Sequence, residues 1–425
     1  MSLAATLQTY KTQLQRNADW LAVAVAVVLP WSTSATSIFL VLWLLALLPI
    51  LELGALRRAV ATPAGGLPIL LGALAVLGLL WGTAPWAEAW RGLEPFAKLL
   101  VIPLLFFHFS QSGRGLEVMV GFLVSCTALL LLSDVLYVWP TFPWFPIKMY
   151  AVPVKDYIAQ SGEFAICASV TAFVALDHLK ARRLLMAFAY GALAAAFLQN
   201  IFYVATGRTA LVTLPLLFLL LGLRQLGLKG AVGFAVGAAI LLVAVWFSSP
   251  YLQSRITQIT QEVKAYEQDN EVTSAGERLY FWKKSLGIMT GAPLIGHGTG
   301  SIRSTFEKAV VGESGLWARA TVNPHNQILA IGIQLGLVGI AALFAMWLSH
   351  LLLFREPGLV AWIGLVVVVQ NIVGSLFNSH LFDFVQGWTY AVGVGVAGGM
   401  MLRRRSEQPA KHDAAGPGRS VHGIG

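Results

Sequence analysis

The sequence predicts an all-α membrane protein with about twelve transmembrane helices. Of its 425 residues, 57% are hydrophobic and only 12% are charged, whereas soluble domains carry roughly twice that share of charge. Long apolar runs recur along the chain, and about 20 such residues suffice to cross the hydrocarbon core of a bilayer. The composition therefore indicates a polytopic helical protein and argues against a soluble enzyme.

Twelve apolar segments are the candidate spans. They cover residues 18–31, 34–52, 66–82, 96–110, 115–138, 162–179, 184–205, 208–224, 229–248, 325–353, 357–376 and 382–402. The first follows Lys11 and Arg16, as in a signal peptide, but the eleven further segments favour a retained signal anchor. Cys126 and Cys167 both lie within apolar runs, which favours packing positions over a disulfide or a metal site.

The distribution of Lys and Arg predicts the orientation. Sixteen of the 29 lie in short connections or tails on one side, and 13 lie on the other. Eight of those 13 fall in one loop of 75 residues, which the positive-inside rule does not count. Both termini are therefore expected in the cytoplasm. The net charge of +9 then reflects topology, and no nucleic-acid partner is expected.

This orientation divides the chain into four parts. Residues 1–248 hold the first nine spans, and residues 249–323 form a large periplasmic loop. Residues 324–402 hold the last three spans. Residues 403–425 are expected to be a disordered cytoplasmic tail, because "SEQPAKHDAAGPGRSVHGIG" is small, polar and rich in glycine and proline.

The large loop is expected to be helical. In "YLQSRITQITQEVKAY" apolar residues recur at helical spacing, with Arg255 at the edge of the stripe, which predicts an amphipathic helix. Ser274 and Glu277 then form a capping box that opens a second helix, with Arg278 in its first turns and Trp282 one turn further. "GAPLIGHGTGS" is expected to be a glycine-rich break in which "GHGTGS" is a flexible connector, and "IRSTFEKAV" is expected to be a third short helix. Such a loop can roof a cavity at the membrane surface.

Motifs of soluble enzymes are missing from the sequence. There is no HExxH, Walker A, GxSxG or DxD pattern, and the glycines of "GHGTGS" follow no strand, as a dinucleotide loop would require. We therefore expect no metal, no nucleotide and no other cofactor.

Cations on the loop side are the first candidates for chemistry. Arg208 lies between two spans with almost no loop, where a charge is costly and tends to mark a substrate path, although a snorkelling arginine is the alternative. Arg255 and Arg278 lie in the loop, while Lys98 and Arg91, near the outer end of the fourth span, are weaker candidates. The two loop arginines could instead pair with nearby acids, namely Glu262, Glu267, Asp269, Glu271 or Glu277.

The stretch "ATVNPHNQIL" places a histidine where a membrane helix should begin. Asn323 is a good N-cap and Pro324 suits the first helical position, which makes His325 the second helical residue and Asn326 the third. The field at a helix N-terminus disfavours imidazolium, so His325 should be neutral with one nitrogen lone pair free. A capping or interfacial histidine is the alternative interpretation.

The remaining histidines on this side are expected to play supporting or structural roles. They are His297 and His380, the latter with Asp383 as a possible partner in "NSHLFDF". Arginines beside a helix N-terminus suit the phosphates of a lipid headgroup, and a neutral histidine can accept a proton from an attacking hydroxyl. Together they point to glycosyl transfer from a polyprenyl diphosphate sugar.

Three motifs resemble the O-antigen ligase family, WaaL. They are "TGRTAL", "SAGERLYFWKKSLGIMTGAPLIGHGTGS" and "NPHNQILAIGIQLGLVG", concentrated in residues 200–345. The family shares a domain with O-antigen polymerases (Wzy) and bacterial O-oligosaccharyltransferases. Arg208, Arg278 with Trp282, and His325 match its motifs, and Arg255 matches by location. "SLFNSHLFDF" lacks a clear acid where many relatives have one, which leaves Asp383 as a weak candidate.

The resemblance implies a GT-C-type, metal-independent, inverting glycosyltransferase of the Gram-negative inner membrane. It would transfer polymerised O-antigen from undecaprenyl diphosphate to a sugar hydroxyl of lipid A–core, on the periplasmic face. Arg208, Arg255 and Arg278 would hold the donor diphosphate, and His325 would activate the acceptor. An O-antigen polymerase or a protein O-oligosaccharyltransferase would use the same donor. A non-catalytic transporter of lipid-linked sugars is a more distant alternative, because the cations gather on one face and not at the midplane.

Overall fold

The structure, a computed structural model, describes residues 3–141, 151–269, 273–314 and 318–407. Within these ranges the chain is helical and has no β-strand, which confirms the predicted all-α class. The first part of the bundle is formed by α1 (Leu3–Val28), α2 (Thr33–Leu47), the 3₁₀ turn η1 (Leu48–Ile50), α3 (Leu53–Ala61), α4 (Pro63–Leu77), α5 (Trp86–Gln111), α6 (Gly115–Val138), α7 (Tyr157–Lys180), α8 (Leu184–Tyr203) and α9 (Arg208–Ser248). The second part is formed by α13 (Gln327–Leu353), α14 (Leu359–Ser375) and α15 (Phe384–Glu407).

The apolar helices make this a multi-pass membrane protein. Seven helices in the described ranges are long and apolar enough to cross a bilayer, or eight if α3 and α4, bent by 88° at Thr62, form one broken span. α9 is two helices joined at Gly227, whose φ is +70°, and the predicted spans 208–224 and 229–248 lie on either side of it. Each of the twelve predicted segments overlaps a helix, while the count of twelve membrane crossings stays a prediction. α15 runs to Glu407, and the rest of the predicted tail lies outside the described residues.

α5 and α15 form the most extensive helix pair of the bundle. Their close approach depends on small residues, because a Cβ added to Gly395 would lie 2.5 Å from Leu105 and one added to Gly398 would lie 2.2 Å from Phe106. Small residues let membrane helices pack closely where burial from water gives no driving force. This pair fixes the turn before α15 against α5, and that turn carries part of the candidate site.

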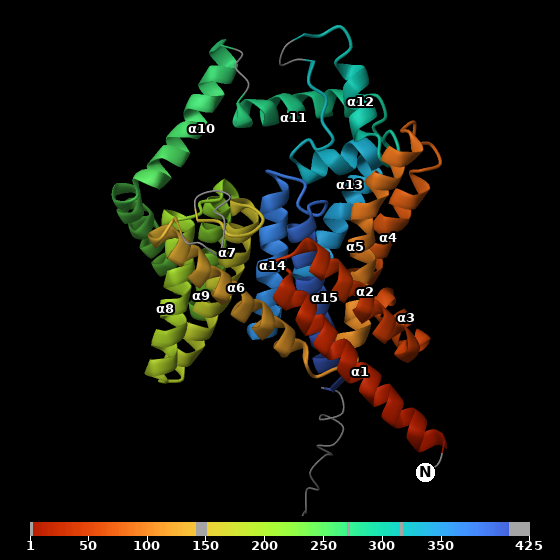
Figure 1. The fold of residues 1–425 in the computed structure, drawn as a ribbon, viewed down its shortest axis with the longest axis vertical. Helices are drawn as coiled ribbons and strands as arrows, with labels where there is room; N and C mark the ends of the chain where they lie inside the picture. The colour runs from red at the N-terminus through yellow and green to blue at the C-terminus, as the bar shows by residue number, and fades with distance from the viewer. Residues whose placement is uncertain (1–2, 142–150, 270–272, 315–317, 408–425) are drawn as a thin grey trace, which may run out of the picture.

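Three helices cover one end of the bundle, which we call the loop face. They are α10 (Pro250–Asp269), α11 (Ser274–Thr290) and α12 (Ile302–Ala309), and α11 lies across the end of the bundle opposite the chain's N-terminus (Figure 1). The three predicted loop helices are thus confirmed. The predicted cap of the second is wrong by one residue: Thr273 is the N-cap, because its hydroxyl accepts from the N–H of Gly276 at 3.1 Å.

The glycine-rich segment 291–300 is docked into α13, so the prediction of a flexible connector is wrong. α13 is broken at Gly336, whose φ is +61°. His297 and Gly298 donate their N–H groups to the carbonyls of Ile333 and Gln334, at 2.8 and 2.9 Å. In return, residues 337 and 338 of α13 donate to the carbonyls of residues 293 and 294, at 2.8 and 3.1 Å. Backbone groups freed by the helix break are therefore satisfied by the loop.

The start of α13 also differs from the prediction. The N-cap is Asn326 and not Asn323, because the Asn326 side chain accepts from the N–H groups of Ile328 and Leu329 at 2.9 and 3.1 Å. His325 lies outside the helix with a φ of +53°. Asparagine 323 instead accepts the N–H of His325 at 2.9 Å. Two candidate caps compete here, and the one that reaches two orphan N–H groups sets the helix start.

Candidate active site

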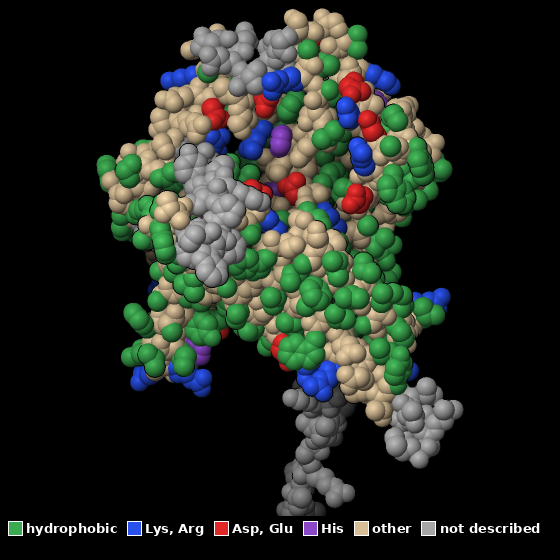
Figure 2. All heavy atoms as spheres, viewed as in Figure 1, with side chains coloured by type: hydrophobic (Ala, Val, Ile, Leu, Met, Phe, Trp, Pro, Cys, Tyr) green, Lys and Arg blue, Asp and Glu red, His purple; other side chains and the backbone are tan. Residues whose placement is uncertain are grey.

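The loop face carries a polar hollow below α10 and α11. Acidic, basic and histidine side chains gather around it, whereas the flanks of the bundle are covered by hydrophobic side chains (Figure 2). Five segments supply the polar groups: the start of α9, the helices α10 and α11, the turn 323–326, and the turn 376–383.

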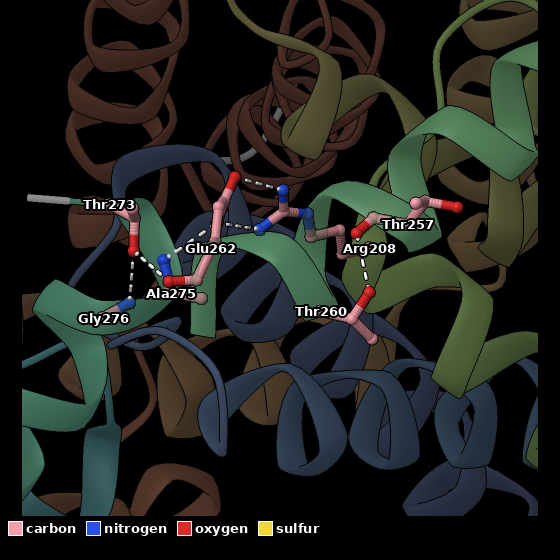
Figure 3. Close-up of polar contacts among 7 residues, drawn as sticks. All are labelled: Arg208, Thr257, Thr260, Glu262, Thr273, Ala275 and Gly276. Carbon is pink, nitrogen blue, oxygen red and sulfur yellow. Dashed lines mark hydrogen bonds and ion pairs between the residues drawn. The ribbon is translucent and has the colours of Figure 1, made fainter. Parts of the chain in front are cut away.

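Arg208 is the first residue of α9 and forms a bidentate ion pair with Glu262 of α10 (Figure 3). The two N–O distances are 2.9 and 3.2 Å. Glu262 also accepts the N–H of Ala275, at 3.0 Å, and its carbonyl accepts the hydroxyl of Thr273, at 2.8 Å. One carboxylate therefore ties the start of α9 to the start of α11.

Arg278 lies on α11 and is half-buried. It makes no hydrogen bond or salt bridge with any described residue. Burial is the main cause that lowers its pKa, and the nearby charge of Arg208 lowers it further, while Tyr157 and Glu262 act in the opposite direction. A half-buried guanidinium without a counterion in the described part of the chain is well placed to bind an anion.

The acids predicted as alternative partners of Arg278 are engaged elsewhere or not described. Glu262 pairs with Arg208, and Glu277 pairs with Arg319. The side chains of Glu267 and Asp269, and the whole of Glu271, lie outside the described part of the structure. The same holds for the side chain of Arg255, although its backbone lies in α10 as predicted.

Lys98 and Arg91 have different surroundings, although both come from α5. Lys98 is buried and donates to the carbonyls of Phe382 and Asp383, at 2.9 and 2.8 Å. It therefore holds the turn before α15 in place. Arg91 is exposed and lines a separate cavity together with Asn323 and Asp383.

His325 is held by contacts from the turn 376–383 and from α11. Its Nδ1 lies 2.9 Å from Oδ1 of Asn378, and its carbonyl accepts the indole N–H of Trp282 at 3.3 Å. The ring stacks on Phe281 with the centroids 6.4 Å apart and an interplanar angle of 26°. The structure therefore brings Trp282 and His325 together, and α11 packs directly over the histidine.

The hydrogen bonds around Asn378 fix which nitrogen of His325 carries the proton. The Asn378 amide nitrogen donates to the carboxylate of Asp383 at 2.6 Å. Its oxygen therefore faces the side-chain N–H of Asn323, at 3.1 Å, and Nδ1 of His325. Because that oxygen can only accept, Nδ1 must donate. The lone pair of a neutral His325 ring is thus on Nε2, which bonds to no described residue.

The electrostatic environment favours the neutral ring. Burial is the main cause that lowers the pKa of His325, and the charge of Arg278 lowers it further. The hydrogen bond to Asn378 and the charge of Glu277 oppose this shift. The expected neutral histidine is therefore supported, but by burial and a neighbouring cation and not by a position inside the helix.

The other predicted residues surround this centre. Asn323 accepts the hydroxyl of Ser379 at 2.7 Å, and Asn326 adds a bond from its amide to the carbonyl of Leu376 at 3.1 Å. His380 is buried, and burial together with the charge of Arg278 lowers its pKa to about 4. His297 lies 2.8 Å from the carbonyl of Ile288 and has a structural environment.

Sequence reasoning missed Asn378. An isolated amide carries no chemistry of its own, so nothing in "NSHLFDF" singled it out. The available signal was its position five residues before Asp383, in a short connection on the same side as "NPHN". Glu262 was considered only as a partner for the loop arginines, and its bond to Arg208 depends on the tertiary placement of α10.

The fold and the site together define a multi-pass helical membrane protein with a cluster of cationic and histidine side chains under a helical loop. Residues 192–344 match the family model described as O-antigen ligase, which confirms the predicted resemblance over this part of the chain. The match includes Arg208, Arg278, Trp282 and His325, whereas Asn378 and Asp383 lie beyond it.

A curated relative is an uncharacterized protein of Haemophilus influenzae (strain ATCC 51907 / DSM 11121 / KW20 / Rd). It is 27% identical over 159 residues, which is 35% of this chain and 38% of the relative. The chain thus matches well under half of that relative's length.

Proposed function

We propose that the protein is an O-antigen ligase that transfers a glycan from undecaprenyl diphosphate to a sugar hydroxyl of lipid A–core. The observation that carries this proposal is the pairing of a half-buried guanidinium, that of Arg278, with a histidine whose Nε2 is open. The O-antigen ligase domain over residues 192–344 supports the same reaction class.

The cations act on the leaving group. As the bond between the anomeric carbon and the phosphate oxygen breaks, negative charge grows on the lipid-linked diphosphate. Arg278 stabilises that charge with donors that no described residue occupies. Arg208 adds its charge nearby, although both its terminal nitrogens bind Glu262, and Arg255 joins them on the strength of the resemblance.

His325 acts on the acceptor. Nε2 takes the proton of the acceptor hydroxyl as its oxygen attacks the anomeric carbon from the face opposite the diphosphate, which inverts that centre. The proton then resides on the imidazolium, and Asn378 holds the ring through Nδ1. The step uses no metal and no nucleotide.

The proposal includes the setting of the reaction. The chain would lie in a bacterial inner membrane with both termini in the cytoplasm, twelve spans in a GT-C-type bundle, and the loop face in the periplasm. Labelling of single cysteines introduced on α12 and at residue 182, with a membrane-impermeant thiol reagent on intact cells, tests this. Labelling confined to residue 182 would show that the orientation is the opposite of the one proposed.

The decisive assay combines purified protein, polyprenyl-diphosphate glycan and lipid A–core, with and without a chelator. Glycan joined to lipid A–core in both conditions is the expected result. Longer lipid-linked glycans would identify a polymerase, and glycan on a protein acceptor an O-oligosaccharyltransferase. Translocation in liposomes without any transfer would identify a transporter.

A further inference from the structure

A second cavity lies beside the His325 network. It has a volume of about 380 Å³, and its lining includes Glu88, Arg91, Arg303, Asn323, Phe382 and Asp383. Asn323 and Asp383 both bind Asn378, which holds the His325 ring. The cavity and the catalytic histidine therefore share a wall.

This cavity is distinct from the surroundings of Arg278. None of the groups that influence the charge of Arg278, namely Arg208, Tyr157 and Glu262, lines it. A transfer between two large substrates needs a place for each, on either side of the group that moves the proton. Asn323 lines this cavity and also bonds to Asn378, so the cavity lies next to the network of residues 323, 325 and 378.

The lining suits a saccharide with an anionic substituent. Oε2 of Glu88 is buried and has no hydrogen-bond partner among the described residues. Oδ1 of Asp383 is likewise unbonded within the described ranges, since Oδ2 takes the bond from Asn378. Carboxylate oxygens accept from sugar hydroxyls, and Phe382 offers an aromatic surface. Arg91 forms no salt bridge within the described chain and can bind a phosphate or carboxylate.

The cavity is built on rigid backbone contacts. A Cβ on Gly92 of α5 would lie 2.4 Å from the Cα of Gly300. Gly300 itself has a φ of +82°, and its N–H donates to the side chain of Gln334 in α13 at 2.8 Å. α5 and the docked glycine segment therefore meet without intervening side chains, and the volume of 380 Å³ falls in the usual range of ligand sites.

We propose that this cavity is the acceptor subsite and binds the sugars next to the reacting hydroxyl, with an anionic substituent at Arg91. This inference rests on the proposed function, because it assigns the second substrate of that reaction. Arg303, which reaches Glu307 at 2.9 Å and Glu88 at 3.7 Å, lies at the exposed mouth. The donor glycan is the alternative occupant of this cavity, and the experiment must distinguish it from the acceptor.

The test compares Michaelis constants for the two substrates in Arg91→Ala, Glu88→Gln and wild type. Loss of one charge-assisted hydrogen bond corresponds to roughly a tenfold weaker interaction. We expect the acceptor KM to rise about tenfold in each variant, with the donor KM unchanged and partial recovery in Arg91→Lys. Lys283→Ala, which removes an exposed cation of α11, is the matched control and should resemble wild type in melting temperature and both constants.

The outcomes separate this inference from the proposed function. Wild-type transfer to lipid A–core with unchanged acceptor KM in both variants overturns the acceptor subsite and leaves the ligase proposal standing. A selective rise in donor KM assigns the cavity to the donor glycan, which also overturns it. Elongation of lipid-linked glycan in place of transfer to lipid A–core overturns the ligase proposal, and the same comparison is then made with the lipid-linked acceptor.

Discussion

Histidines in the helical core and the histidine at the centre of the loop-face site differ in how many of their ring nitrogens form hydrogen bonds. In the core, Nε2 of His108 lies 2.9 Å from Asp19 and Nδ1 accepts the indole N–H of Trp43 at 3.1 Å. His350 is likewise bonded at both nitrogens, to Tyr390 and to the carbonyl of Ala64, at 2.6 and 2.8 Å. His325 uses only one ring nitrogen.

This difference distinguishes a histidine that stabilises the fold from a histidine that can act on a ligand. His108 and His350 bond through both ring nitrogens, because an unpaired polar atom in the helical core is costly. His325 instead keeps one nitrogen open in a polar hollow and has the other fixed by an amide that is itself fixed by a carboxylate. Such support is typical of groups whose free atom acts on a ligand.

The largest contrast is expected between His325→Ala and His108→Ala. Removing His325 should lower transfer by about 10²–10⁴-fold, the usual contribution of a general base, while the protein melts normally. Removing His108 should instead lower the melting temperature, because Asp19 and Trp43 lose their buried partner. Transfer at the wild-type rate by His325→Ala would remove this residue from the chemistry.

Arg278 should be the next most sensitive position. Arg278→Ala is expected to reduce kcat by about 10²–10³-fold, the range for losing one donor to developing charge. Arg278→Lys should recover only part of this, because an ammonium lacks the planar, fixed pair of N–H donors with which a guanidinium binds two phosphate oxygens side by side. Arg319→Lys, on an exposed arginine paired with Glu277, is the control for conservative replacement. Full rescue by lysine would show that a point charge is sufficient.

Asn378 is expected to be a positioning residue with a smaller effect. Asn378→Ala removes the acceptor for Nδ1 of His325 and should lower kcat about 10–100-fold. Asn378→Asp should retain more activity and raise the pH at which the rate declines, because a carboxylate beside the ring stabilises imidazolium. If the pH dependence of kcat in Asn378→Asp is the same as in wild type, residue 378 does not act through the His325 ring.

The pH profile gives the smallest and most specific test. The base must be unprotonated, so transfer should decline as pH falls through the pKa of His325, which burial lowers from its ordinary value of 6.5. Arg278→Gln removes a charge that lowers this pKa and should move the decline to higher pH. Glu277→Gln removes a charge that raises it and should move the decline to lower pH. Shifts in the same direction would contradict this electrostatic arrangement.

Much of the fold followed from local pattern. Apolar runs located the bundle helices, helical spacing located α10, and a capping signal located the start of α11 to within one residue. The start of α13 was misplaced because two asparagines three residues apart both suit an N-cap. The choice depends on which side chain reaches the free N–H groups once Asn323 is bound to the turn 376–383.

Site residues could be predicted where charge and motif spacing indicate them. They could not be predicted where tertiary contacts determine what a side chain bonds to. Arg278, Trp282 and His325 come together as expected. Lys98 and Arg91 could not be separated from sequence, since one bonds backbone carbonyls 284 residues away and the other faces a cavity. The Asn378 amide can orient the His325 ring only because the fold places it between Asp383 and His325.

The docking of segment 291–300 into α13 bears on how the protein is assembled. Until His297 and Gly298 reach their partners, the break at Gly336 leaves carbonyls of a membrane helix without donors. Such groups are poorly tolerated in lipid. We therefore expect insertion of this helix to be coupled to closure of the glycine segment upon it. The same contacts would then position α11 and α12, which lie on either side of that segment, over the candidate site.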